Sequence, residues 1–379
     1  MIPSIVLLLA IQEAMPATVS NSNKLGFQML AEMSEKSSEN LCISPLSITT
    51  AGTMLRRGSS ALSGPMLGKL LNQAGQSESQ ATSGLQAVYH SLDGYRNSGV
   101  LFAANGVWSS TKWPVKKSYT EDMQALFGAE ARSMDLGQPD AHQKVNQWVA
   151  DHTNGRIKDL FKPFDSQTCL VLANCIFFKD QWRGHGFDAG EMDFKAAAGK
   201  SKKVKSFSIG MPELDTNSKF QRVTMSYKSG LAMEVYLPAA NSSPEKVLAS
   251  DEFLKMAGTS GSGTALRAII PKWKSEYSLP LADYWKSHGG AFLFKSGRRL
   301  FPGIIDQESW IQQAVHKTFI QVDENGTEAA AATGIAVGTR GAPPRDLPVV
   351  NVDRAFVYAI TDPKTKTVLF VGIVKNPAY

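Results

Sequence analysis

A nearly continuous run of apolar and β-branched residues at positions 168–178 (TCLVLANCIFF) most constrains how this chain can fold. Such a run predicts a strand that is buried on both faces. Residues 315–322, 355–360 and 367–375 are also strand-like, and the last two flank the turn signal Asp362-Pro363, which predicts a hairpin. The second half of the chain is therefore expected to be rich in strands.

The first half carries helical patterns instead. Apolar residues at mixed three- and four-residue spacing predict an amphipathic helix over residues 23–33. Ser44 suits the N-cap of the next helix, Pro45 its first turn and Gly58 its end. A further helical stripe over 145–152 ends near Asn154-Gly155. Helices followed by strands predict an α+β fold.

The chain of 379 residues shows no composition break and no Gly/Ser-rich or Pro-rich linker, so residues 18–379 are expected to form one large domain. Residues 1–17 are interpreted as a signal peptide or an N-terminal extension, because an apolar stretch at 2–11 precedes Ala14 and Ala17. A secreted protein is expected. No basic residue precedes the apolar stretch, which keeps a cytoplasmic location as the alternative.

The formal charge of +6 permits attraction to polyanions. The basic runs are short, at 200–205 and at Arg298-Arg299, and no aromatic interleaving accompanies them. A solvated surface is favoured, with no nucleic-acid or membrane partner, and a sulfated polysaccharide stays open as a cofactor. Cys169 and Cys175 would lie about 20 Å apart in one strand, too far to bond, so all cysteines are expected to be free thiols.

The segment 324–346 (ENGTEAAAATGIAVGTRGAPPRD) is the most unusual part of the sequence. It is long, small-chained and without a helical stripe, as functional or disordered loops are. At period two, however, every β-branched residue between Thr327 and Thr339 falls on one face, which is the pattern of a half-buried strand. The segment can therefore be a loop that also occupies a sheet. An alanine-rich linker or an ordinary edge strand is the alternative.

This segment resembles the hinge and reactive-centre loop of inhibitory serpins. The hinge residues that carry the resemblance are Glu324, Gly326, Thr327, Glu328, Ala329, Ala330, Ala331 and Ala332. Further family-like segments occur in the expected order at 40–53, 172–182, 316–317 and 351–360, so the resemblance spans residues 20–379. It implies a serpin fold: a helix-rich N-terminal half packed on a large mixed β-sheet, with smaller sheets and an exposed reactive-centre loop at about 324–346.

The resemblance also assigns positions under and beside the sheet. Those that match the family's shutter are Ser44, Ser47, Asn174 and His316. Trp182 matches the breach aromatic, where loop insertion begins. The chain departs from the family pattern at Ala355, where proline is usual, and at Cys42 and Cys175.

The family's mechanism implies a protease as the partner. The residue attacked by the protease usually lies about sixteen positions after the hinge glutamate, and here that position is Arg340, followed by Gly341. Arginine suits trypsin-like serine proteases, whose acidic pocket can pair with a guanidinium. The implied product is a covalent acyl complex with a monomeric inhibitor, and apart from the sulfated polysaccharide left open above, no cofactor or metal is expected.

An enzyme and a non-inhibitory serpin are the two alternative functions. An enzyme is disfavoured because the sequence has no G-x-S-x-G elbow, P-loop, HExxH or Cys-x-x-Cys motif. A non-inhibitory serpin that acts as a carrier or chaperone would share the fold, but such members typically have bulky, charged or proline residues in the hinge. The small residues at 329–332 argue against this alternative.

Overall fold

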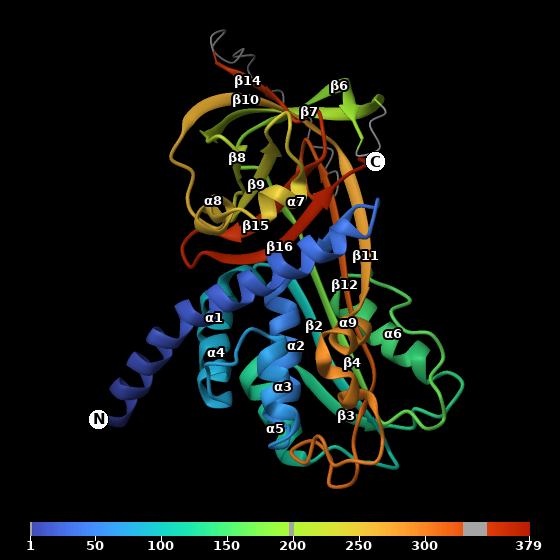
Figure 1. The fold of residues 1–379 in the computed structure, drawn as a ribbon. Coiled ribbons are helices and arrows are strands. Elements are labelled where there is room, and N and C mark those ends of the chain that lie inside the picture. Colours follow the sequence, from blue (N-terminus) through green and yellow to red (C-terminus); the bar gives the residue numbers. More distant parts are fainter. Residues whose placement is uncertain (1, 197–200, 329–346) are drawn as a thin grey trace. The chain divides into compact units, whose positions relative to one another are not determined.

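The computed structural model of the protein describes residues 2–196, 201–328 and 347–379 (Figure 1). Contacts divide the chain into two compact units, each assembled from segments that are distant in the sequence. The first unit comprises Met1–Leu25, Ser44–Phe177 and Ser278–Thr318. The second comprises Gly26–Ile43, Phe178–Tyr277 and Phe319–Tyr379.

Most of the described helices lie in the first half of the chain. The α-helices are α1 (Ile2–Glu35), α2 (Pro45–Arg57), α3 (Ser63–Leu70), α4 (Glu78–Asn97), α5 (Lys117–Phe127), α6 (Ala141–His152), α7 (Pro244–Leu248), α8 (Asp251–Met256) and α9 (Leu281–Trp285). Two short helical turns, Lys286–Gly290 and Ala291–Phe294, follow α9.

Most of the described strands lie in the second half. They are β1 (Leu41–Ile43), β2 (Leu101–Ser110), β3 (Glu130–Met134), β4 (Leu170–Phe178), β5 (Asp180–Gln181), β6 (Gly186–Lys195), β7 (Ser201–Thr216), β8 (Phe220–Ser226), β9 (Ala232–Pro238), β10 (Thr264–Pro271), β11 (Trp273–Pro280), β12 (Ile311–Asp323), β13 (Gly326–Thr327), β14 (Val349–Asn351), β15 (Phe356–Asp362) and β16 (Thr367–Val374). The predicted α+β class is confirmed.

The start of α2 follows the predicted capping chemistry. The Ser47 N–H donates to Ser44 Oγ, the N-cap side chain, at 3.2 Å, and Pro45 opens the first turn. Proline is well placed there because the first helical N–H groups have no intrahelical partner. The helix ends at Gly58, as predicted.

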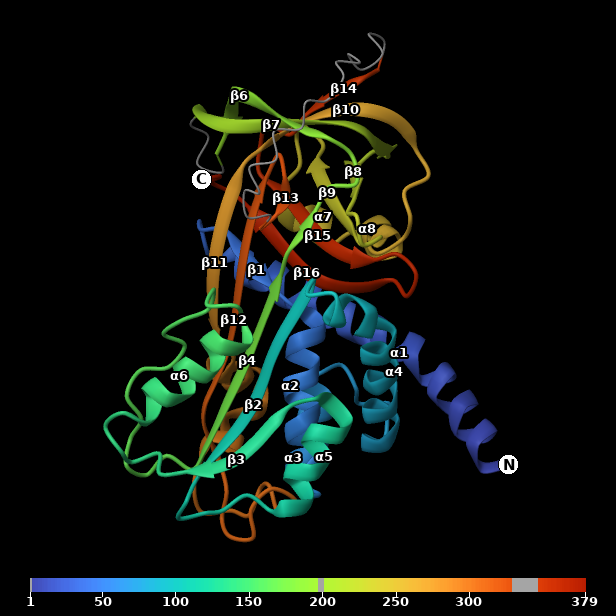
Figure 2. The same ribbon diagram turned by 180° about the vertical axis from the view of Figure 1, so that it is seen from behind.

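In the first unit, β3, β2, β4 and β12 lie side by side in that order. Every residue of β4 is buried, which confirms the strand predicted from the run at 168–178. Helices α2 and α4 contact the neighbouring strand β2 from one side, and α6 contacts it from the other (Figure 2). The burial of every residue of β4 explains why the run has no polar face.

The second unit is built on an antiparallel-rich sheet with the order β1-β16-β15-β9-β8-β7-β10-β14, and β6 pairs with β7. The predicted hairpin is present as β15 and β16, which are buried along their whole length. Helix α7 contacts β9 and β15 of this sheet.

Two smaller expectations concern the cysteines and the membrane. Cys42, Cys169 and Cys175 form no disulfide, as predicted, and the structure shows all three to be buried. Among the described residues, no helix is both long and apolar enough to cross a bilayer.

Candidate functional site

The beginning of the segment at 324–346 already lies in a sheet. Strand β13 sits between β12 and β5 and is antiparallel to both: Thr327 pairs with Val322 on one side and with Asp180 on the other (Figure 2). Thr327 is fully buried, and its Oγ1 lies 2.6 Å from Tyr227 Oη. The Glu328 N–H continues the ladder to the Gln321 carbonyl at 2.7 Å. The sequence pattern assigned Thr327 to the part of the loop that inserts later, whereas in the structure Thr327 already lies within the sheet.

Gly326 is required by the way β13 enters the sheet. Its φ of +148° is rarely adopted by residues with a side chain, and an added Cβ would lie 2.1 Å from the Asp180 carbonyl oxygen. Glycine is the residue that lets the backbone approach a neighbouring strand this closely. The hinge glycine inferred from the family resemblance thus has a local physical reason.

Trp182 lies against the same strand ends. Its indole Nε1 donates to the Asp323 carbonyl at 2.8 Å, and its backbone N–H donates to the Asn325 carbonyl at 3.2 Å. The indole also stacks on the ring of Tyr227, with 4.6 Å between centroids. The structure therefore brings the predicted breach tryptophan together with the hinge.

An ion-pair cluster holds Glu324 at the end of β12. The Lys272 ammonium lies 2.7 Å from the Glu324 carboxylate and 2.8 Å from that of Asp188, and its side chain is only 5% exposed. Tyr379 adds a contact on the other side by donating from Oη to the Asp323 carboxylate at 2.6 Å. Sequence reasoning missed Lys272, Asp188 and Tyr379, because partners this distant in the sequence leave no local pattern.

The four predicted shutter residues lie together in the first unit. The Ser44 N–H donates to His316 Nε2 at 3.0 Å, so the neutral ring carries its proton on Nδ1. Nδ1 then donates to Asn174 Oδ1 at 2.6 Å, and Asn174 Nδ2 donates to Ser47 Oγ at 2.7 Å. This chain joins β12, β4 and the start of α2. Burial lowers the pKa of His316 to about 3, which keeps the ring neutral.

Asn105 on β2 extends the shutter beyond the predicted set. Its Oδ1 accepts a second bond from Asn174 Nδ2 at 2.6 Å, and its Nδ2 lies 3.4 Å from Tyr89 Oη. Asn105 is 5% exposed, in the middle of a strand that is mostly buried. An amide within a buried strand is the feature that could have identified Asn105 from the sequence, because buried polar groups need partners.

Ala329, Ala330, Ala331, Ala332, Arg340 and Gly341 lie outside the described residues. The predicted reactive bond and the second half of the hinge therefore remain sequence-based predictions.

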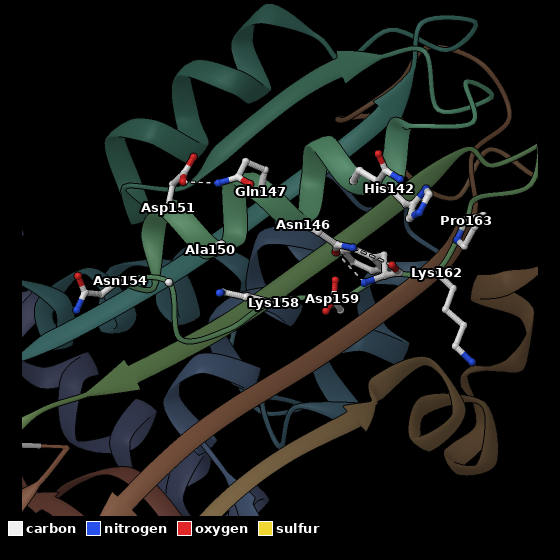
Figure 3. A pocket seen from close by; sticks show the side chains of 13 residues that line it. His142, Asn146, Gln147, Ala150, Asp151, Asn154, Lys158, Asp159, Lys162 and Pro163 are labelled. Carbon is white, nitrogen blue, oxygen red and sulfur yellow. Dashed lines mark hydrogen bonds between the residues drawn. The ribbon is translucent and has the colours of Figure 1, made fainter. Parts of the chain in front are cut away.

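A polar cavity of about 920 Å³ lies between α6 and the segment that follows it (Figure 3). Asn146 fastens this segment to the helix by bonding both the N–H and the carbonyl of Phe161, at 2.8 and 2.9 Å. The Lys158 carbonyl in the same segment accepts from Lys317 Nζ at 2.8 Å, next to the shutter histidine. Any shift of β12 must break this contact or carry the segment along.

The two clusters contain donors and acceptors that bridge strands. No group of histidine, cysteine, aspartate or glutamate in the described ranges is arranged to hold a metal ion.

A family model described as "Serpin (serine protease inhibitor)" matches residues 20–377. Human Serpin B12 is 28% identical over 410 aligned residues, which cover 96% of this chain and 100% of the relative.

Solved structures have the same fold. Native protease nexin-1 with heparin matches with a TM-score of 0.81 at 21% identity, covering 97% of this chain and 100% of the other. Human thyroxine-binding globulin matches with a TM-score of 0.83 at 21% identity and the same coverage.

Proposed function

The chain belongs to the serpin family, and on that premise we propose that it inhibits trypsin-like serine proteases as a suicide substrate. Members of the family generally act as protease inhibitors or as binders rather than as enzymes. The proposal adds the target class and the mechanism to this general role.

The single observation that carries the proposal is the position of β13 between β12 and β5. A strand of two residues is already inserted, and the sequence continues its alternating pattern from Thr327 to Thr339. No proline interrupts this stretch, so each further residue can add ladder bonds. Insertion would lengthen an existing strand and would need no new nucleus.

The observed registers predict where the inserted residues would go. Thr327 pairs with Val322 and Asp180, so six residues further along the antiparallel ladders Thr333 would face His316 on β12 and Asn174 on β4. The bond of His316 to Asn174, at 2.6 Å, would then have to open to admit the new strand. A threonine hydroxyl can both donate and accept, so Thr333 can replace part of the bond that is lost.

The proposed reaction begins when the serine Oγ of the protease attacks the Arg340 carbonyl carbon. The Arg340–Gly341 peptide bond breaks, Gly341 leaves with a protonated amine, and an ester joins Arg340 to the protease. Insertion of residues 329–339 then removes the ester from the geometry needed for attack by water. The new ladder bonds and the burial of the β-branched face would supply the driving force.

The test is to mix the protein with trypsin and look for a complex of summed mass that survives SDS. We expect this band for wild type. Arg340→Ala should slow association with trypsin by orders of magnitude, whereas Arg345→Ala, the matched control, should leave it unchanged. If Arg345→Ala abolishes the complex and Arg340→Ala does not, the predicted reactive bond is wrong.

A carrier without inhibitory activity is the second candidate, because thyroxine-binding globulin shares the fold. The small residues of the hinge argue against it. The same gel distinguishes the two: a carrier would be cleaved by trypsin or left intact, and no stable complex would form.

A further inference from the structure

A second cavity, with a volume of about 750 Å³, lies in the second unit. Its lining residues include members of β6, β7, β8 and β10, and these strands are labelled in Figure 1. This volume is within the range of sites that enclose small organic ligands. None of the hinge or shutter residues described above lines it. The trapping mechanism therefore leaves it unused.

The strand registers place an aromatic ring, an open space and a cation on one face of this sheet. Phe187 pairs with Ser208, and Arg267 pairs with Gly210, two residues further along β7. A Cβ added at Gly210 would meet no atom within 4 Å, so the cavity opens directly above this glycine. Phe187 is 61% exposed beside it, which is unusual for a large apolar side chain.

The polar residues that line the cavity are incompletely paired. Thr224 is only 6% exposed, and its hydroxyl has no hydrogen-bond partner in the part of the chain that the structure describes. A buried hydroxyl without a partner has lost its bonds to water and gained none in return. A ligand atom that bonds this hydroxyl would supply the missing hydrogen bond.

The charge of the lining favours an anion. Arg183 and Arg267 are exposed and form no ion pair with any described residue, and Glu213 is the carboxylate that lines the cavity with them. Unpaired guanidinium groups are the side chains best suited to bind a carboxylate or sulfonate. Phe187 and Pro212 supply apolar surface next to these cations.

We propose that this cavity binds a small amphiphilic anion, with an aromatic body against Phe187 and Pro212 and a carboxylate or sulfonate paired with Arg267 and Arg183. The Thr224 hydroxyl bonds a polar atom of the same ligand. The described residues that line the cavity include none of the hinge or shutter residues.

The test is a fluorescence titration of the intact protein with 8-anilinonaphthalene-1-sulfonate, an aromatic sulfonate. We expect saturable binding at one site. Gly210→Leu, whose added Cβ would meet no atom within 4 Å and whose side chain would occupy the open space, should abolish it. Arg267→Gln should weaken it at least about tenfold, equivalent to ~1.4 kcal/mol. Arg298→Gln, a matched exposed arginine in the other unit, should leave the dissociation constant unchanged.

Two further measurements separate a built site from nonspecific adsorption. Thr224→Val removes the unpaired hydroxyl, so binding should weaken severalfold while thermal stability is unchanged or higher. Naphthalene-1-sulfonate should displace the dye, and neutral 1-naphthol, its uncharged counterpart, should do so at least tenfold more weakly. The proposal is overturned if folded Gly210→Leu binds the dye as wild type does, if Arg298→Gln weakens binding as much as Arg267→Gln, or if the two naphthalenes compete equally.

Discussion

Acidification should destabilise the folded protein through His316. The folded protein holds this ring neutral, with a pKa of about 3, whereas the ordinary value is 6.5. Below pH 6.5 the unfolded chain therefore takes up a proton that the folded protein does not. By linkage, this contribution lowers the free energy of unfolding as the pH falls from 6.5 towards 3, and it is absent above pH 6.5.

The size of the effect follows from the window. From the ordinary value of 6.5 down to pH 5 is 1.5 pH units, and at about 1.36 kcal/mol per unit the loss is about 2 kcal/mol. Solvent screening does not reduce this loss of stability, because His316 is fully buried. Protonation of His316 Nε2 would also remove the acceptor for the Ser44 N–H, so the hydrogen bond that is lost belongs to the shutter.

Glu234 on β9 acts in the opposite direction and would hide this loss in wild type alone. Burial raises the pKa of this carboxyl to about 7, although Tyr236 and Thr361 donate to it at 2.6 and 3.1 Å. Between pH 7 and 4.5 the folded protein binds a proton at this carboxyl that the unfolded chain does not. Its contribution therefore increases the free energy of unfolding as the pH falls from 7 towards 4.5. The measurement must therefore be a difference between variants.

The assay is urea-induced unfolding, followed by tryptophan fluorescence at pH 7 and pH 5, for wild type and His316→Gln. Glutamine does not titrate, so the stability of wild type relative to the variant should fall by about 2 kcal/mol between the two pH values. His90→Gln is the control, because the His90 side chain is 90% exposed, and its difference from wild type should stay constant. An equal difference between wild type and His316→Gln at both pH values would refute the reasoning.

Three further predictions rest on carboxylates of the second unit. Glu234→Gln should remove the opposing effect, so that the variant loses about 2 kcal/mol relative to wild type on going from pH 7 to pH 5, as measured by the same unfolding assay. Glu245→Gln should lower stability by about 1–2 kcal/mol in thermal unfolding, because Glu245 pairs with the buried ammonium of Lys375 at 2.9 Å, whereas Glu32→Gln, at an exposed helical pair, should cost less than about 0.5 kcal/mol. Glu324→Gln should lower the free energy of unfolding by about 1–2 kcal/mol in the same assay, and by more than Asp188→Asn does, since Glu324 is the less exposed partner of Lys272. A larger loss for Asp188→Asn would contradict the cluster as described.

Local chemistry was enough to predict some elements of the fold. Ser44, Pro45 and Gly58 act on α2 through contacts with their own neighbours, so their roles can be read without a tertiary structure. The strand β4 was equally easy to predict, because a strand that is buried on both faces consists almost entirely of apolar residues. The exception within it, Asn174, is the residue that the shutter uses.

Partners across the fold could not be predicted in this way. Lys272 reads as one more surface lysine, yet its side chain is 5% exposed because two carboxylates distant in the sequence enclose it. Asn105 and Tyr227 likewise act through residues that the fold alone brings near. The family resemblance supplied Ser47 and His316, which spacing and periodicity would have assigned to an ordinary polar core.

The position of Thr327 changes how loop insertion has to be tested. Thr327 is already fully buried before any cleavage, with its Oγ1 2.6 Å from Tyr227 Oη. A charge at this position would therefore be unfavourable in the native state as well as in the inserted state. Thr327→Arg would therefore destabilise the native hinge by several kcal/mol as well as the trapped product, and a slower insertion could not be separated from a weaker native state. In the proposed mechanism, the driving force for trapping has to come from residues beyond Glu328, since the ladder is already formed up to that point. Thr333, which the registers direct to His316 and Asn174, is the position where a charge would oppose the product through the shutter.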